Sequence, residues 1–156
     1  MGEACVWAGF ALIAVGADFV QRGRFWPLPL VAATGYALLV TNILYINQFP
    51  DRRADEAAGK RHWVVRPGAR RARWGYVAIA TAAYAWLLGS VVVGMLPWPA
   101  LSALLPARLS ARAARDLLRF ANQPRELAPA IQMNIGAATL HGLLLAIALV
   151  AAGLHT

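Results

Sequence analysis

The stretch WPLPLVAATGYALLVTNILYINQFPDRRADEAAGKR, residues 26–61, decides how the chain folds. Its first part, from Trp26 to Ile46, is apolar and long enough to cross a hydrocarbon core of roughly 30 Å at about 1.5 Å per residue. A polar segment follows, in which charged residues begin at Asp51 and include two aspartates and a closing Lys60-Arg61 pair. The stretch therefore predicts a membrane-spanning helix that ends in a charged segment.

The composition of the whole chain agrees with a membrane protein. Of its 156 residues, 60% are hydrophobic and 14% are charged, and the mean hydropathy is +0.53. A soluble domain of this size is rarely so apolar. The net charge of +8 comes from cations between the apolar runs, without a nucleic-acid-binding motif, so we expect no nucleic-acid partner. Because Cys5 is the single cysteine, the chain cannot form an intrachain disulfide.

Five apolar segments predict an all-α fold, a multi-pass transmembrane helical bundle of about five helices. They are expected at Ala4–Val20, Trp26–Ile46, Trp74–Leu96, Ala100–Ala107 and Ala130–Leu154. The charged residues 47–73 are expected to form a loop, in which Pro50 bends the chain and Gly59 stops any helix. No linker or second domain is evident, so residues 1–156 are expected to form a single membrane domain.

The fourth segment differs from the others because its apolar part is brief. Four arginines follow it at spacings of four, three and four, which place them on one face of a helix. These are Arg108, Arg112, Arg115 and Arg119. We therefore expect this helix to extend out of the membrane with an arginine stripe.

The distribution of cations predicts the orientation. If the five segments alternate in direction, every Lys and Arg except Arg22 and Arg24 falls on one side of the membrane. Cytoplasmic loops carry such an excess of positive charge. We therefore expect the charged loop 47–73 to face the cytoplasm from the cell inner (plasma) membrane.

The charged loop also carries candidate site residues. Asn47, Asp51 and Asp55 are four residues apart, so on a continuing helix they point to one side. Two carboxylates suit Mg²⁺, which takes hard oxygen ligands, and Lys60 and Arg61 can neutralise a diphosphate bound to that ion. In a membrane, the diphosphate would carry a prenyl tail. The alternative is a solvated loop whose aspartates and arginines merely pair with each other.

The spacing Asn47-x-x-x-Asp51-x-x-x-Asp55-x-x-Ala-Gly-Lys60-Arg61 resembles the second aspartate-rich motif of the UbiA superfamily of membrane prenyltransferases. The continuation Val64-Val65-Arg66-x-Gly68 most resembles the branch that prenylates 1,4-dihydroxy-2-naphthoate in menaquinone synthesis. Gly2-Glu3 and Thr139-Leu-His141-Gly142 are similar to the start of the family's fifth and ninth helices. The resemblance thus covers nearly the whole chain, but only the C-terminal half of the nine-helix family fold.

The resemblance implies roles for individual residues. Asp51 and Asp55 would be the catalytic Mg²⁺ ligands, Asn47 would orient ligand or metal-bound water, and Lys60 and Arg61 would hold the diphosphate. For Asn42, lining the substrate cavity and packing between helices remain equally open. The family also has an earlier aspartate-rich motif on the facing wall of the cavity. The sequence shows no copy of that motif, because Asp18, Asp116 and Glu126 are isolated.

The function that the resemblance implies is transfer of a polyprenyl group from a prenyl diphosphate to an aromatic quinone precursor such as 1,4-dihydroxy-2-naphthoate, with Mg²⁺ as cofactor. The expected partners are those two substrates, membrane lipid and a chain that carries the first motif. Two other interpretations stay open. The chain could be one subunit of a split enzyme, or an inactive or binding-only half-size membrane protein that holds isoprenoid diphosphates.

Overall fold

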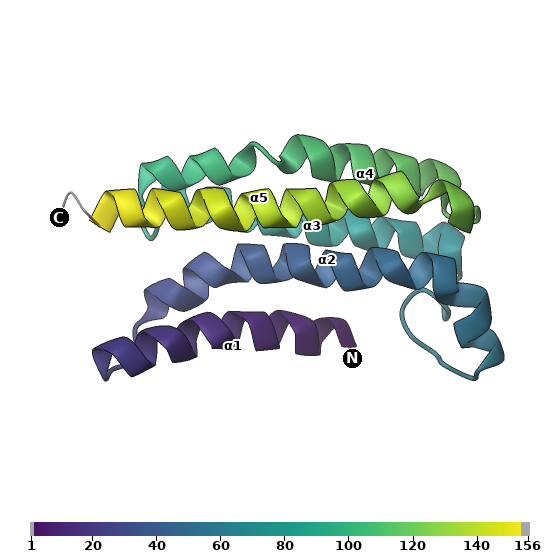
Figure 1. The fold of residues 1–156 in the computed structure, drawn as a ribbon, viewed down its shortest axis with the longest axis horizontal. Coiled ribbons are helices and arrows are strands. Elements are labelled where there is room, and N and C mark those ends of the chain that lie inside the picture. Colours follow the sequence, from purple (N-terminus) through teal and green to yellow (C-terminus); the bar gives the residue numbers. More distant parts are fainter. Residues whose placement is uncertain (1, 154–156) are drawn as a thin grey trace.

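The computed structural model describes residues 2–153 and consists of helices joined by short connections (Figure 1). Its α-helices are α1 Gly2–Arg22, α2 Pro27–Ala57, α3 Ala69–Val92, α4 Ala107–Phe120 and α5 Ala128–Gly153. Two short 3-10 helices, η1 Trp98–Leu104 and η2 Pro124–Glu126, precede α4 and α5. The described residues contain no strand, so the predicted all-α helical bundle is confirmed.

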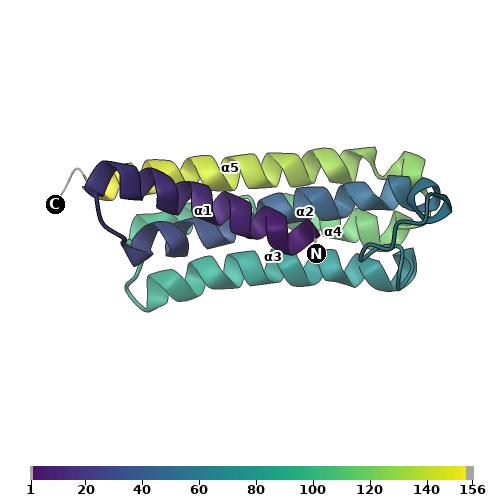
Figure 2. The ribbon, with the colours of Figure 1, turned by 90° about the horizontal axis from the view of Figure 1, so that it is seen from below.

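Four helices, α1, α2, α3 and α5, are long and apolar enough to cross a membrane. They share one long axis, and α2 packs against each of the other three (Figures 1 and 2). Residues 58–68 connect α2 to α3 at one end of the bundle, which we call the motif end. The turn between α1 and α2 lies at the opposite end, here called the far end (Figure 1).

Small residues allow these helices to approach closely, as is common in membrane bundles. A Cβ atom on Gly75 of α3 would overlap the hydroxyl of Tyr45 on α2. A Cβ atom on Gly142 of α5 would lie 2.8 Å from the ring of Tyr36. Both glycines therefore make room for a tyrosine from α2, which fixes α2 against its neighbours on two sides.

Buried polar side chains tie α2, α3 and α5 together. The side-chain amide of Asn42 donates to the Tyr76 carbonyl at 3.1 Å, and the Tyr76 hydroxyl donates to the side-chain oxygen of Asn134 at 2.8 Å. All three residues are completely buried. His141 is also completely buried, with Nδ1 2.9 Å from the Ala103 carbonyl oxygen, which is a packing position.

The fourth segment differs from the sequence prediction. The arginine-bearing helix does not extend beyond the bundle, because α4 lies beside α3 and α5, with Ser110, Ala113 and Leu117 buried (Figure 1). Small and apolar residues opposite the arginine stripe make this contact possible. The helix is too short and too basic to cross a membrane alone, so η1 and α4 together run along the bundle.

The second segment also ends later than predicted. It continues as a helix through Asn47 to Ala57, so the connection is confined to residues 58–68 instead of 47–73. Pro50 removes one backbone hydrogen bond but does not end the helix, and an Arg52–Glu56 ion pair one turn apart spans the following turn. Leu154, the predicted end of the last segment, lies outside the described residues.

Candidate functional site

The acidic face occupies the last turns of α2. Asn47, Asp51 and Asp55 all belong to this helix, so their four-residue spacing places them on one side, as predicted. The helix bends away from its initial axis near this end, in the region of Pro50 (Figure 1). The bend carries the two carboxylates to the surface of the motif end, outside the packed interior.

The end of α2 brings a lysine back over this face. Gly59 has a φ of 75°, and its amide donates to the Glu56 carbonyl, while the Lys60 amide donates to the Asp55 carbonyl at 2.9 Å. This is the Schellman arrangement that ends many helices, and it favours glycine at the left-handed position. It reverses the chain at once, so Lys60 returns towards Asp55.

Two side chains from the connection hold the Asp55 carboxylate. Lys60 Nζ lies 2.7 Å from one oxygen, and His62 Nε2 lies 3.1 Å from the other. The Val64 amide donates to His62 Nδ1, so Nε2 carries the proton that is donated to Asp55. The hydrogen bond to Asp55 and the charge of that carboxylate raise the pKa of Lys60 above its usual value. We call Asp55, Lys60 and His62 the Asp55 clamp.

Asp51 and Asn47 are less constrained than Asp55. Both are exposed, and within residues 2–153 the Asp51 carboxylate makes no hydrogen bond or ion pair. The Asn47 amide group donates to the Ile43 carbonyl at 2.7 Å. The donation occupies the amide nitrogen and leaves the side-chain oxygen as an acceptor beside the aspartates.

The basic residues form a hollow next to the acidic face. It has a volume of about 510 Å³ and is lined by Glu56, Gly59, Lys60, Arg61, Val65 and Arg66. The Arg66 guanidinium donates to the Arg61 carbonyl at 2.8 Å, which closes the turn on itself. Three cations and one carboxylate at an exposed hollow suit a small anion with several oxygen atoms.

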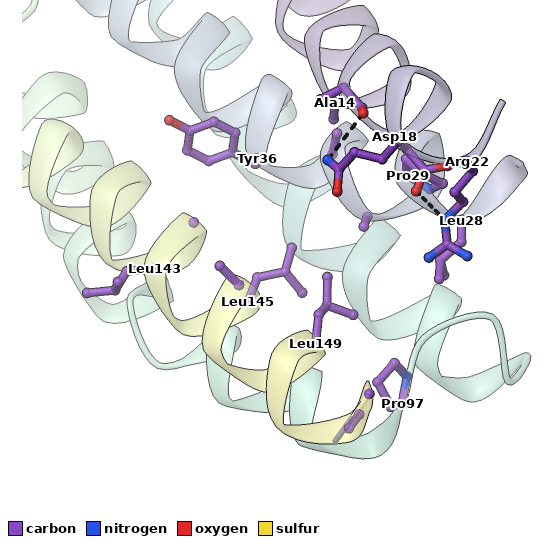
Figure 3. A pocket seen from close by; sticks show the side chains of 18 of the residues that line it. Ala14, Asp18, Arg22, Leu28, Pro29, Tyr36, Pro97, Leu143, Leu145 and Leu149 are labelled. Atoms are coloured by element: carbon purple, nitrogen blue, oxygen red, sulfur yellow. Dashed lines mark hydrogen bonds and ion pairs between the residues drawn. The ribbon is translucent and has the colours of Figure 1, made fainter. Parts of the chain in front are cut away.

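A large apolar pocket lies on the same side of α2, at the far end. It has a volume of about 1030 Å³ between α1, α2 and α5, and Figure 3 shows Tyr36, Leu143 and Leu149 along its walls. An ion pair of 2.7 Å between Asp18 and Arg22 marks its polar edge.

The pocket and the acidic face share one side of the helix. Pro29, Ala33 and Tyr36 line the pocket and are spaced by four and three residues. At about 100° per residue, Asn47 and Asp51 follow on that same side. Tyr36 and Asp51 are about 22 Å apart along the axis, given about 1.5 Å per residue. One face of α2 thus connects an anionic end with an apolar pocket.

Asn42 is not brought to this face. Its side chain is completely buried in the contact between α2 and α3, where it donates to Tyr76. Of the two roles left open for it, this position favours packing. His62, by contrast, is a site residue that the sequence interpretation missed. The glycine stop at Gly59 is the signal that could have found it, since a Schellman turn predicts that the following residues fold back on the helix.

The comparison with known proteins agrees with the geometry. The sequence profile of the UbiA prenyltransferase family matches residues 1–136. The chain belongs to this family. No curated protein and no solved structure matches the chain.

Members of the UbiA family are prenyltransferases, and membership together with four apolar helices makes this chain a membrane protein. The matched residues include the acidic face, the Asp55 clamp and the basic hollow. They stop within α5, so Thr139–Gly142, in the middle of that helix, lies beyond the match.

The residues of this UbiA-family face fit part of a magnesium site. Two carboxylates one turn apart and a neighbouring amide oxygen are hard oxygen ligands, and Mg²⁺ usually takes one or two carboxylates together with water and phosphate oxygens. Within residues 2–153, no group of three or more His, Cys, Asp and Glu side chains is arranged to hold a metal. The donors present would therefore supply only part of a Mg²⁺ coordination shell, and phosphate, water or another protein segment would have to supply the rest.

Proposed function

We propose that this chain binds the Mg²⁺-diphosphate group of a prenyl diphosphate on the acidic face of α2. As part of a complete UbiA fold, it contributes to transfer of the prenyl group to an aromatic quinone precursor. The observation that carries this proposal is the single face of α2 that leads from Asp51 and Asn47 to the apolar pocket around Tyr36. Such a surface suits a ligand with a charged head and a long apolar tail.

Each residue has a task in this proposal. Asp51 and Asp55 would hold Mg²⁺ through carboxylate oxygens, and a bound Mg²⁺ would supply positive charge that stabilises the diphosphate as a leaving group. Asn47 would offer its side-chain oxygen as a hydrogen-bond acceptor to ligand or metal-bound water. Lys60 and Arg61 bind phosphate oxygens as a point charge and a forked donor. To do so, Lys60 would move from the Asp55 carboxylate to the ligand, which would also free one oxygen of that carboxylate while His62 keeps the other.

The substrate and orientation belong to the same proposal. The residues after the aspartates resemble the branch that uses 1,4-dihydroxy-2-naphthoate, so we propose that acceptor and a role in menaquinone synthesis. The cations at the motif end support a cytoplasmic location for the acidic face. Because the acidic face supplies one wall of the site, we expect little prenyl transfer without a second segment that carries the opposing aspartates.

Binding tests the proposal directly. The purified chain in detergent is titrated with farnesyl diphosphate, with and without Mg²⁺, and the heat of binding is measured. We expect Mg²⁺-dependent binding that the double variant Asp51→Asn/Asp55→Asn weakens by about 100-fold or more. Glu126→Gln removes one carboxylate from η2 at the motif end and serves as the matched control. Equal binding by the double variant and the parent chain would refute the proposal.

A further inference from the structure

A second long groove lies outside the proposed site, between α3 and α4. It has a volume of about 640 Å³, and its walls are mostly small or apolar side chains. Val77 and Leu118 line the part nearer the motif end, while Leu88 of α3 lines the part nearer the far end. The hydroxyls of Tyr84 and Ser110 meet at 2.9 Å between the two helices and hold them together.

The length of the groove matches one leaflet of a bilayer. From Val77 to Leu88, α3 rises about 16 Å at about 1.5 Å per residue. Half of a hydrocarbon core of roughly 30 Å is about the same length. A groove of this length with apolar walls suits a single lipid acyl chain that lies along the helices.

Arg115 lines the groove in its half nearer the motif end. It belongs to a face of α4 on which four arginines are exposed, namely Arg108, Arg112, Arg115 and Arg119. Within residues 2–153, none of these four guanidiniums makes a hydrogen bond or an ion pair, and only Arg119 has a ring partner, Phe120, at 5.1 Å. Exposed guanidiniums beside a membrane helix need an anionic or aqueous partner, since charge in hydrocarbon is costly.

Neighbouring residues indicate where the membrane surface lies. Arg73 of α3 donates to the Leu118 carbonyl, which places these two residues at the same level. Trp74, the next residue, is 58% exposed, and tryptophan is enriched where a membrane meets water. Arg115 is three residues deeper than Leu118, less than one helical turn below that level. A lipid phosphate at the membrane surface would therefore lie within reach of the long Arg115 side chain.

We propose that the groove between α3 and α4 is a binding site for an anionic phospholipid, with one acyl chain between the helices and the phosphate on Arg115. Arg119, one turn closer to the membrane surface on the same face of α4, adds positive charge at the level of the headgroup, which favours an anionic lipid over a zwitterionic one. The positive charge of Arg115, the apolar walls of the groove and its length of about one leaflet are all consistent with an anionic phospholipid. A protein helix in the same place would have to bring its own carboxylates to depths where they are costly.

Native mass spectrometry of the full chain in detergent tests this site. The probes are palmitoyl-oleoyl phosphatidylglycerol and, at the same concentration, palmitoyl-oleoyl phosphatidylcholine. We expect the chain to retain phosphatidylglycerol preferentially and Arg115→Gln to retain about fivefold less of it. Ala111→Trp fills the exposed groove wall without removing a guanidinium, and we expect the same loss. Arg24→Gln, which removes one cation at the far end, should leave retention unchanged.

Three results would overturn the proposal. Equal retention of both lipids would exclude headgroup recognition. Full retention by Ala111→Trp would show that the arginines attract lipid without a groove site. Dimers of the parent chain that Ala111→Trp dissociates would show that a second copy occupies the face. A thermal unfolding curve for each variant, with a midpoint close to that of the parent chain, confirms that any lost retention reflects the site and not misfolding.

Discussion

Asn42 and Asn47 are the same residue type on the same helix, yet they lie in opposite environments. Asn42 is completely buried, and its amide donates to the carbonyl of Tyr76 on another helix. Asn47 is exposed, and its amide donates to its own helix at Ile43. Five residues turn an α-helix by about 140° beyond a full turn, which separates an inner face from an outer face.

The difference shows what polar groups do on each face. On the inner face, Asn42 and Tyr45 bind backbone carbonyls of α3, so their polarity fixes the position of α2. On the outer face, Asp51 makes no hydrogen bond or ion pair within residues 2–153, and Asp55 binds only the connection that follows it. The inner face therefore governs stability, and we expect the outer face to govern ligand binding.

The largest effect is expected where α3 meets the inner face. Gly75→Ala places a methyl group against the Tyr45 hydroxyl, which itself is held by the Ala72 carbonyl at 2.8 Å. Because both are packed between helices, we expect a loss of about 2–3 kcal/mol in unfolding free energy, measured by denaturant titration in mixed micelles. Gly89→Ala in the same helix meets nothing within 4 Å and should be neutral or slightly stabilising. Equal stability of the two variants would show that the inner face is not tightly packed.

The sequence predicts the apolar helices well because a hydrocarbon core demands long uncharged segments. The central parts of α2 and α3 follow from this rule, although α3 begins at Ala69 and ends at Val92 instead of the predicted Trp74 and Leu96. The acidic face is also predictable, because the spacing of Asn47, Asp51 and Asp55 needs only a continuing helix. The sequence pattern does not predict how far α2 continues, because a charged segment that contains Pro50 resembles a loop.

Tertiary placement could not be predicted from these patterns. The arginine stripe suggests a helix in water, but Ser110, Ala113 and Leu117 on its other side pack into the bundle. Small residues such as Ser110 and Ala113 are weak indicators of burial in a sequence. The arginine stripe is the stronger pattern, and it indicates an exposed helix. The Asp55 clamp depends on side chains that the turn at Gly59 brings together. The residue types alone therefore do not indicate that His62 contacts Asp55.

A pair of matched variants compares the two asparagines directly. Asn42→Ala leaves a small void and removes an interhelical hydrogen bond, so we expect a loss of about 1 kcal/mol in unfolding free energy. Its binding of Mg²⁺ and farnesyl diphosphate should not change. Asn47→Ala should leave stability unchanged and weaken that binding by about tenfold, because it removes an acceptor beside the aspartates. The assignment of the two faces fails if Asn42→Ala weakens binding as much as Asn47→Ala does.

The smallest expected effect concerns the turn that forms the Asp55 clamp. Gly59 and Gly94 both have a φ of 75° after a helix, and in both turns the next amide donates to a carbonyl five residues earlier. Alanine at either position should therefore cost about 1 kcal/mol in unfolding free energy, since a side chain disfavours the left-handed conformation.

Only Gly59→Ala should loosen the motif end, because Lys60 and His62 then lose the turn that returns them to Asp55. Hydrogen–deuterium exchange followed by mass spectrometry should show faster exchange in residues 58–68 for Gly59→Ala and no change there for Gly94→Ala. If the two variants exchange alike in these residues, the turn does not hold the clamp. The connection would then owe its shape to the packing of buried Val64 against the bundle core.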